Sequence, residues 1–365
     1  MLNKRHCNIP IFIPQKACPH QCIYCNQSYI SGQQTAPTLC EVQHTIERYL
    51  STAEKDTDIQ VAFFGGTFTG LDIEEQKNYL ETVKPYITSG RIQSVRLSTR
   101  PDYINTEILD ILKHYNVTDI ELGAQSLDKE VLRFSERGHT AQDVEHASQL
   151  IRSYGFNLGL QMMIGLPKDT PEKSISTAEK IVSLGAVSSR IYPTLVIDRT
   201  PLAAMYKQGL YEPLTIENAV NQTKEVYKIL NNANIKVLRV GLHPSEDLIN
   251  GKGYLAGPFH VSFFELVKTA LWKDKFSGII SEINTNVPKD NSAIPFNNAP
   301  NSPCQIKKSD TTRNLHEITC ITVNPKDINY AIGYKSSNLR LLRQYFPNIK
   351  FLQDKNVARD TFVIS

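Results

Sequence analysis

Short β-rich runs alternate with amphipathic helical stretches through the first two thirds of the chain, and this alternation restricts the fold most. The β-rich runs lie at 9–14, 59–64, 94–99, 119–125, 157–164 and 189–196. Helical spacing of apolar residues covers 72–87, 105–115, 141–154, 171–184 and 216–233. Such alternation is typical of a parallel sheet wrapped by helices. It predicts an α/β fold of six strand–helix units, and periodicity alone leaves open a doubly wound sheet or a partial barrel.

The pattern changes after about residue 245, where Gly, Pro and Asn become frequent. The segment 284–303 is typical of a loop or linker. A β-like run at 317–323 and a helical stretch at 337–345 follow it. With 365 residues, the chain exceeds the usual size of one domain. We therefore predict a core domain at 1–245 and a smaller α+β module at 246–365.

Composition indicates an ordinary soluble protein. Hydrophobic residues make up 41% and charged residues 21%, and the net charge is +3, which by itself does not indicate nucleic-acid binding. No apolar run approaches the roughly 20 residues of a membrane helix, and the first residues do not have the pattern of a signal peptide. We expect a cytoplasmic protein with no membrane partner.

Three of the seven cysteines, Cys18, Cys22 and Cys25, form a C-x3-C-x2-C cluster. In a reducing compartment such a cluster binds metal more often than it forms disulfides. Three thiolates at this spacing can hold a 4Fe–4S cluster and leave one iron open for chemistry. The other four, Cys7, Cys40, Cys304 and Cys320, are interpreted as structural thiols.

The alternative interpretation of the cluster is a structural zinc site that uses Cys22 and Cys25 with two distant ligands such as Cys40 and His44. Structural zinc normally has four protein ligands, often from two paired motifs. The chain has no second C-x2-C pair. The spacing therefore favours iron–sulfur over zinc.

Two glycines, Gly65 and Gly66, follow the second predicted strand. Paired glycines let the backbone approach a ligand closely, although alone they are often a simple turn. Together with the cysteine loop, the sequence GGTF at 65–68 resembles the radical S-adenosylmethionine superfamily. The later motifs narrow the resemblance to the radical domain of the Elongator catalytic subunit, which modifies tRNA wobble uridine: ELGAQ at 121–125, RGHT at 137–140, MIGLP at 163–167 and RIYPTLV at 190–196.

This resemblance covers about residues 5–245 and implies a partial (β/α)6 TIM-like barrel that binds a 4Fe–4S cluster and S-adenosylmethionine. The cluster would be held by the three cysteines of the loop. By position, Tyr24 would lie near the adenine of S-adenosylmethionine. The methionine amino group would be bound by Gly65, Gly66 and Thr67.

The same resemblance implies further binding residues on the later strands. Ser98 and Arg100 would face the ribose or the substrate, and Gln125 would bond the ribose or the carboxylate. Arg137 could pair with the carboxylate, or it could form a surface ion pair. Gly165 and Tyr192 would close the adenine pocket. Ser98 and Gln125 could instead be interior hydrogen-bonding residues, and Tyr192 could belong to the core.

The chain also departs from the Elongator pattern. The Elongator subunit spaces its first two cluster cysteines further apart and carries an acetyltransferase domain. Only about 120 residues follow the predicted barrel here, and they contain no loop typical of acetyl-coenzyme A binding. The chain resembles instead a shorter bacterial Elongator-like relative, and carboxymethylation with acetyl-coenzyme A is not expected.

The leading hypothesis is a radical enzyme that abstracts hydrogen from its substrate, with tRNA favoured over a peptide or small molecule. It would take electrons from a reductant such as flavodoxin or ferredoxin. The alternative is a non-catalytic protein of this fold that binds haem or another cofactor. The segment 253–260, which ends at His260, could be a lid or an inter-domain hinge. Basic and aromatic residues of the C-terminal module could contact RNA: Lys326, Tyr330, Tyr334, Lys335, Arg340, Arg343, Tyr345, Phe346 and Lys350.

Overall fold

The computed structural model describes residues 5–14, 18, 22–27, 35–54, 56–242, 246–285 and 318–365. The chain divides into two compact units, Met1–Val261 and Ser262–Ser365. This division falls later in the chain than the boundary expected near residue 245. Among the described residues, none of the helices has both the length and the apolar character needed to span a bilayer.

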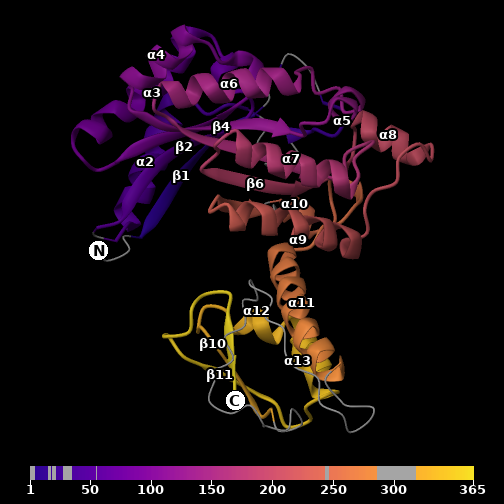
Figure 1. Cartoon of the computed structure of the whole chain (residues 1–365). Coiled ribbons are helices and arrows are strands. Elements are labelled where there is room, and N and C mark those ends of the chain that lie inside the picture. The colour runs from indigo at the N-terminus through magenta and orange to yellow at the C-terminus, as the bar shows by residue number, and fades with distance from the viewer. Residues whose placement is uncertain are drawn as a thin grey trace, which may run out of the picture. The chain divides into compact units, whose positions relative to one another are not determined.

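The first unit is built on a parallel seven-stranded sheet with helices on its outer side (Figure 1). Its strand order is β1-β2-β3-β4-β5-β6-β8, and every neighbouring pair is parallel. The strands are β1 (His6–Ile13), β2 (Asp58–Gly65), β3 (Ser94–Thr99), β4 (Val117–Gln125), β5 (Asn157–Ile164), β6 (Ser188–Pro193) and β8 (Lys236–Val240).

The helices and short turns of this unit connect successive strands. Hydrogen-bonding side chains cap the N-termini of several of them, including Thr38, Asn105, Thr140 and Thr170. The helices are α2 (Leu39–Thr52), α3 (Ile73–Thr88), α4 (Thr106–His114), α5 (Lys129–Phe134), α6 (Ala141–Ser153), α7 (Pro171–Ser183), α8 (Pro201–Lys207), α9 (Ile216–Asn232) and α10 (Glu246–Ile249), with 3-10 turns η1 (Phe68–Gly70) and η2 (Pro101–Tyr103).

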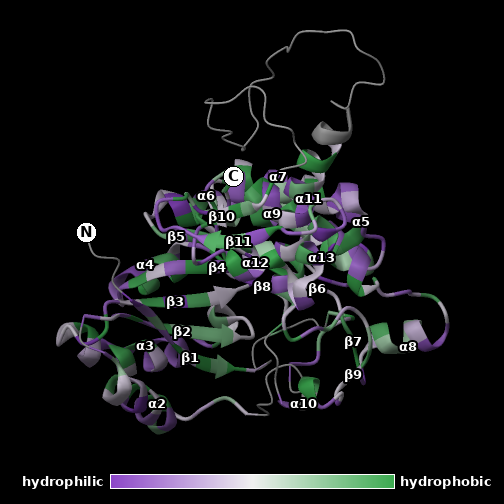
Figure 2. Ribbon diagram, turned by 90° about the horizontal axis from the view of Figure 1, so that it is seen from below, coloured by the Kyte–Doolittle hydropathy of each residue, from purple (hydrophilic) through white to green (hydrophobic). Residues whose placement is uncertain are grey.

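The two faces of the sheet differ in chemistry because side chains alternate along each strand. Figure 2 shows β1, β2 and β3 side by side, with hydrophobic residues along them. One alternating set is apolar and packs under the helices. It includes the fully buried residues Ile9, Val61, Leu97 and Ile120. The other set is polar and includes Gln60, Arg96, Glu121, Gln161 and Arg190, which hydrogen bond with one another.

The sheet curls strongly around this polar face. The guanidinium carbon of Arg190 on β6 lies 4.9 Å from the centre of the Phe64 ring on β2, although three strands separate β2 from β6 in the sheet. A contact between such distant strands requires a concave surface. The predicted partial TIM-like barrel is confirmed, and its concave side is lined by polar residues.

The structure adds elements that the sequence pattern did not predict. Strand β8 is a seventh strand at the edge of the sheet, where its mixed sequence KVLRV gave no clear alternation. Two short strands, β7 (Val196–Ile197) and β9 (Tyr254–Ala256), form an antiparallel pair. Strand β9 comes from the segment expected to be a lid or hinge, and the rings of Tyr254 and Phe259 lie 5.3 Å apart.

The second unit has its own core. The 23-residue helix α11 (Phe263–Thr285) packs with α12 (Ile328–Ile332), η4 (Tyr334–Ser336), α13 (Ser337–Arg343) and a three-stranded sheet. That sheet has the order β11-β10-β12, with β10 (Cys320–Val323), β11 (Lys350–Gln353) and β12 (Phe362–Ile364). This agrees with an α+β module. The loop predicted at 284–303 lies, from residue 286 onward, outside the described residues, as does Cys304.

One expectation for this unit is wrong. Phe346 is 5% exposed and belongs to the core beside Trp272 and Phe276, so it cannot stack on an RNA base. Tyr345 is 45% exposed and keeps an accessible ring. The five predicted cations of this unit are all exposed: Lys326, Lys335, Arg340, Arg343 and Lys350.

Candidate functional site

A cavity of about 260 Å³ opens at the carboxyl ends of the first strands of the sheet. Enzymes with β/α barrels place their chemistry at this end. Eleven residues predicted from the sequence line it: Cys18, Cys22, Tyr24, Cys25, Gly65, Gly66, Thr67, Ser98, Arg100, Gln125 and Arg137. Four further lining residues were not predicted, namely Gln27, Thr99, Gly123 and Gln161.

The described part of the cysteine loop is anchored on both sides. The Ile23 amide donates to the Ser135 carbonyl at 3.3 Å, and the Leu202 amide donates to the Ile23 carbonyl at 2.9 Å. Cys22 and Tyr24 pack in an apolar cluster with Val131, Leu166 and Leu202. The loop is therefore held between α5 and the start of α8, with its cysteines at the cavity.

Two of the cysteine sulfurs contact polar side chains. The Sγ atom of Cys18 lies 3.4 Å from Oγ1 of Thr67, and Nη1 of Arg137 donates to Sγ of Cys22 at 3.3 Å. No disulfide joins the cysteines that the structure describes. In those same parts of the chain, no three His, Cys, Asp or Glu side chains are gathered in an arrangement that could hold a metal ion. The three thiols share one cavity.

Gly65 brings the ends of β1 and β2 close together. Its φ is +112°, and a Cβ atom there would lie 2.7 Å from the Ile13 carbonyl oxygen. The next amide, Gly66 N–H, donates to that same carbonyl at 2.8 Å. A side chain at residue 65 would push away the strand that leads into the cysteine loop, so glycine is required for the backbone to approach here.

Two buried arginines, Arg100 and Arg137, also line the cavity. Arg100 binds the Asp102 carboxylate through two nitrogens, at 2.9 and 2.8 Å, and donates to the Arg137 carbonyl at 2.8 Å. Arg137 is 8% exposed and donates through Nη2 to the Gly123 carbonyl at 2.6 Å. No carboxylate pairs with Arg137 in the described ranges, so the alternative of a surface ion pair is wrong for this residue.

Several buried polar atoms of the cavity residues have no hydrogen-bond partner among the described residues: the Tyr24 hydroxyl, Oε1 of Gln125 and Nε of Arg137. Gln125 also has a φ of +65°, which is unfavourable for a residue with a side chain. Buried polar groups are normally satisfied, and strained residues concentrate at functional sites. Unsatisfied donors and acceptors around a thiol-lined cavity fit a polar ligand such as S-adenosylmethionine beside an iron–sulfur cluster.

His139 is buried near Arg137 and Arg100 and stays neutral. Burial, followed by the charges of Arg137 and Arg100, lowers its pKa to about 3. Its Nε2 lies 3.2 Å from the Ala124 carbonyl, and its Nδ1 has no partner among the described residues. His139 therefore adds no positive charge at neutral pH.

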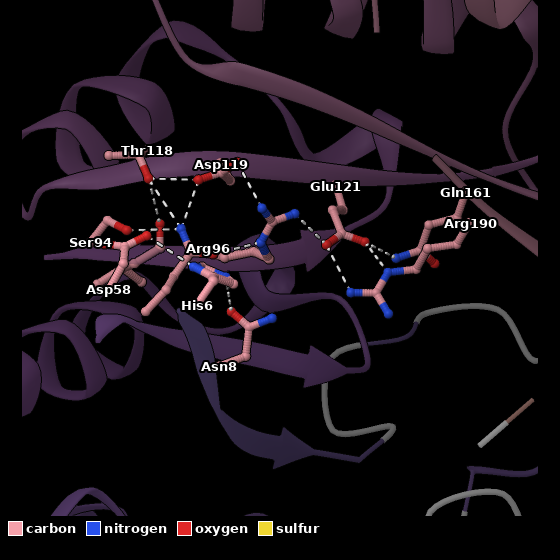
Figure 3. Close-up of polar contacts among 12 residues, drawn as sticks. His6, Asn8, Asp58, Ser94, Arg96, Thr118, Asp119, Glu121, Gln161 and Arg190 are labelled. Carbon is pink, nitrogen blue, oxygen red and sulfur yellow. Dashed lines mark hydrogen bonds and ion pairs between the residues drawn. The ribbon is translucent and has the colours of Figure 1, made fainter. Parts of the chain in front are cut away.

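A charged layer lies on the concave face beneath the cavity (Figure 3). Glu121 is 1% exposed and accepts from Arg96 at 2.8 Å and from Arg190 at 2.6 and 3.1 Å. Arg96 also binds Asp119 at 2.8 Å. Burial alone would raise the pKa of Glu121, but the charges of Arg190 and Arg96 outweigh it and lower that pKa.

Gln161 connects this layer with the cavity. Its Nε2 donates to Glu121 at 3.0 Å and to Ser98 Oγ at 3.2 Å, and both Gln161 and Ser98 line the cavity. Gln161 could have been found from the sequence, because it is the one polar side chain in the run 158–164; the structure places it in register with Gly123 of β4.

Two predicted residues do not line the cavity. Gly165 forms a turn after β5, where its amide donates to Asp169 at 2.7 Å and its carbonyl accepts from Tyr211 at 2.6 Å. Tyr192 follows Arg190 by two residues on β6, so it lies on the concave face, and burial raises the pKa of its hydroxyl. A role for these two residues in adenine binding stays a prediction.

Residues 12–181 match the model of the radical SAM superfamily, and residues 188–273 match that of the radical SAM C-terminal domain. The chain belongs to the radical SAM superfamily. Members of this family generally bind a 4Fe–4S cluster and S-adenosylmethionine, and the radical SAM match includes the cysteine loop and the strand ends that line the cavity.

Several similar curated proteins are named as tRNA uridine(34) acetyltransferases, and others as Elongator complex protein 3. The chain is 26% identical over 230 residues to a tRNA uridine(34) acetyltransferase of Dehalococcoides mccartyi, which aligns 54% of this chain and 50% of the relative. It is 29% identical over 249 residues to the enzyme of the same name from Methanocaldococcus jannaschii, covering 57% of this chain and 46% of the relative. The chain thus spans about half the length of these relatives.

A solved structure has the same fold. The archaeal Elp3 of Methanocaldococcus infernus superposes with a TM-score of 0.59 and 21% identity, over 74% of this chain and 63% of that chain. The likeness supports the curled β/α architecture of the radical SAM domain.

Proposed function

We propose that this chain is a radical SAM enzyme that binds a 4Fe–4S cluster through Cys18, Cys22 and Cys25 and S-adenosylmethionine in the adjoining cavity. The proposal rests on the residues that line one cavity at the carboxyl ends of the strands: three cysteines, together with residues that have unsatisfied polar atoms. Thiolates are the ligands that iron–sulfur clusters favour.

The chain's own residues have distinct tasks in this proposal. The three cysteines would hold the cluster, which would supply the electron for reductive cleavage of S-adenosylmethionine and so the radical chemistry of hydrogen abstraction. Arg137 donates to the Cys22 sulfur, and its unsatisfied Nε can donate to a carboxylate. Gln125 offers an acceptor for a ribose hydroxyl. The apolar packing of Tyr24 and Leu166 excludes water from one side of the loop. Electrons would come from a carrier such as flavodoxin or ferredoxin.

We further propose that the substrate is tRNA. The support is the similarity of the radical domain to proteins named tRNA uridine(34) acetyltransferase. The exposed cations of the second unit, with the exposed ring of Tyr345, add a surface on which RNA could bind by phosphate contact and stacking. The chemistry at the uridine stays open, because this chain spans half of those relatives.

The first experiment is anaerobic reconstitution of the full chain with iron and sulfide, followed by an assay for 5′-deoxyadenosine from S-adenosylmethionine and dithionite. We expect about four irons per chain and deoxyadenosine formation, with both lost in Cys22→Ala. The control is Cys40→Ala, because Cys40 is exposed on α2 and is not among the cavity residues. Bound zinc that is lost in Cys40→Ala would support the zinc site and overturn the proposal.

The second experiment tests the substrate. Unmodified tRNA added to the reconstituted enzyme should accelerate deoxyadenosine formation and leave a modified nucleoside detectable by mass spectrometry. Binding should weaken steeply with salt, because phosphate contacts release counterions. Rates that are equal with and without tRNA, together with binding that does not depend on salt, would reject tRNA as the substrate.

A further inference from the structure

An unusual arginine lies on the concave face at the open edge of the barrel. Strand β8 is the last strand of the sheet, and its Arg239 is in register with Arg190 of β6. Parallel partners in register share a face, so Arg239 projects to the same side as Arg190. Tyr192, two residues beyond Arg190, is on this face as well and interacts with both arginines.

The charges on this face do not balance. Arg96 and Arg190 have carboxylate partners in Asp119 and Glu121. None of the ion pairs among the described residues includes Arg239, whose two hydrogen bonds go to the carbonyls of Gly241 and Leu242, both at 3.0 Å. The residue is half-buried, and burial together with the charge of Arg190 lowers its pKa. One positive charge is therefore partly desolvated without a carboxylate.

An anion would remove this imbalance. A desolvated guanidinium without a counter-charge costs free energy, and its planar donors suit a phosphate or carboxylate. Tyr192, two residues after Arg190 on β6 and on the same face, adds a phenol hydroxyl that can donate a hydrogen bond.

The position also relates this arginine to the candidate active site. Gln161 lines the cavity and donates to Glu121, Glu121 binds Arg190, and Arg190 lies beside Tyr192 and Arg239. A continuous row of polar side chains thus leads from the cavity to the edge of the sheet. A substrate that lies along this row has its reacting part at the cavity and another part at Arg239.

We propose that Arg239 and Tyr192 form a subsite for a phosphate group of the RNA substrate. The proposal rests on the proposed function for the identity of the substrate. A phosphodiester places one negative charge on two accessible oxygens, which matches one guanidinium and one hydroxyl donor. The subsite positions the substrate and takes no part in the radical chemistry.

The test measures anion binding by a readout that does not depend on the radical chemistry. The thermal unfolding midpoint of the reconstituted full chain is compared in sodium phosphate, sodium acetate and sodium chloride at equal ionic strength. Phosphate should raise the midpoint above that in chloride, because a ligand at ten times its Kd multiplies the folding equilibrium constant about 11-fold. Arg239→Gln should abolish this increment, and Arg239→Lys should retain part of it. The matched control is Lys236→Gln, which removes an exposed cation from the same strand and should keep the increment.

Each outcome decides the matter. If the increment is equal in wild type and Arg239→Gln, or absent in wild type, the subsite is overturned. If acetate stabilises as much as phosphate, the site takes carboxylates equally and the assignment to RNA phosphate is overturned. Comparing increments within each variant removes any general loss of stability from the bonds of Arg239 to Gly241 and Leu242. Deoxyadenosine formation by the wild type tests the proposed function independently, so the two can fail separately.

Discussion

Replacing Glu121 with Gln should destabilise the first unit far more than a single hydrogen bond would. Glu121 accepts hydrogen bonds from Arg96, Arg190 and Gln161 at 2.6 to 3.1 Å and is 1% exposed. The amide keeps the shape but removes the charge, and its NH₂ group faces donors. Arg190 then has no carboxylate among the described residues, whereas Arg96 keeps Asp119.

The expected loss is about 3–5 kcal/mol, the range for breaking a buried ion pair by removing one partner. For a domain of this size each kcal/mol shifts the unfolding midpoint by about 2–4 °C, so the midpoint should fall by about 6–20 °C. Urea titration followed by circular dichroism measures the loss, with an unchanged m-value as evidence that the same unfolding is observed.

The matched control is Glu47→Gln. Glu47 binds Arg91 through two hydrogen bonds at 2.8 and 3.2 Å, but both side chains are about half exposed. Exposed pairs of this kind contribute about 0–1 kcal/mol. If Glu121→Gln costs no more than Glu47→Gln, burial does not set the strength of the Glu121 network and the reasoning is refuted.

The same variant predicts a pH dependence. The pKa of Glu121 is lowered in the folded protein: burial opposes this shift, but Arg190 and Arg96 outweigh burial. Its contribution is therefore fully present above the unfolded pKa of about 4.3 and is lost as pH falls through the folded pKa. The stability difference between wild type and Glu121→Gln should be constant near neutral pH and narrow below about pH 4. A difference that stays constant down to pH 3 would contradict the assignment.

Three further predictions follow from the cavity walls. Arg137→Gln removes a positive donor from the Cys22 sulfur, so the reconstituted cluster should have a lower reduction potential in a redox titration followed by electron paramagnetic resonance, and an unchanged potential would contradict this. Gly123→Ala places a Cβ 2.7 Å from Arg137 Nη2 and 2.9 Å from the Gln125 amide nitrogen. It should therefore weaken S-adenosylmethionine binding, as measured by equilibrium dialysis. The control Gly278→Ala, whose Cβ meets nothing within 4 Å, should leave binding unchanged. Burial and the neighbouring arginines lower the pKa of His139 to about 3, so its ring ¹⁵N chemical shifts should not change between pH 5 and 8. The stability that neutral His139 contributes should decline as pH falls below about 6.5. Titration of the ring between pH 5 and 8 would refute its burial as a neutral group.

The sequence predicted those parts of the fold where one face of an element is apolar. Helices α6 and α7 have apolar residues on one side and clear capping residues, so both their presence and their bounds could be predicted. Helix α11 has no single apolar face, because apolar and polar residues are distributed around its whole circumference. Periodicity therefore gave no signal for it. The edge strand β8 was missed for a related reason, since only its last residue is buried.

The sequence predicted the site residues of the cysteine loop and the strand ends better than the charged residues on the concave face of the sheet. The cysteine spacing and the paired glycines are local features, and eleven of the predicted residues line one cavity. The charged layer was missed because an isolated Glu121 or Arg96 in a strand has no local meaning. Only the register of neighbouring strands brings the carboxylates of β4 beside the guanidinium groups of β3 and β6.

This layer explains how an open barrel can have a polar interior and still be stable. A closed barrel of this type fills its centre with apolar side chains. Here, ion pairs among Arg96, Asp119, Glu121 and Arg190 fill the floor, and the geometry satisfies most of their donors. A polar floor leaves hydrogen-bonding groups such as Gln161 and Ser98 facing the cavity above it. The charges that stabilise the sheet therefore also fix the polar groups that a ligand would contact, so changes to Glu121 should alter ligand binding as well as stability.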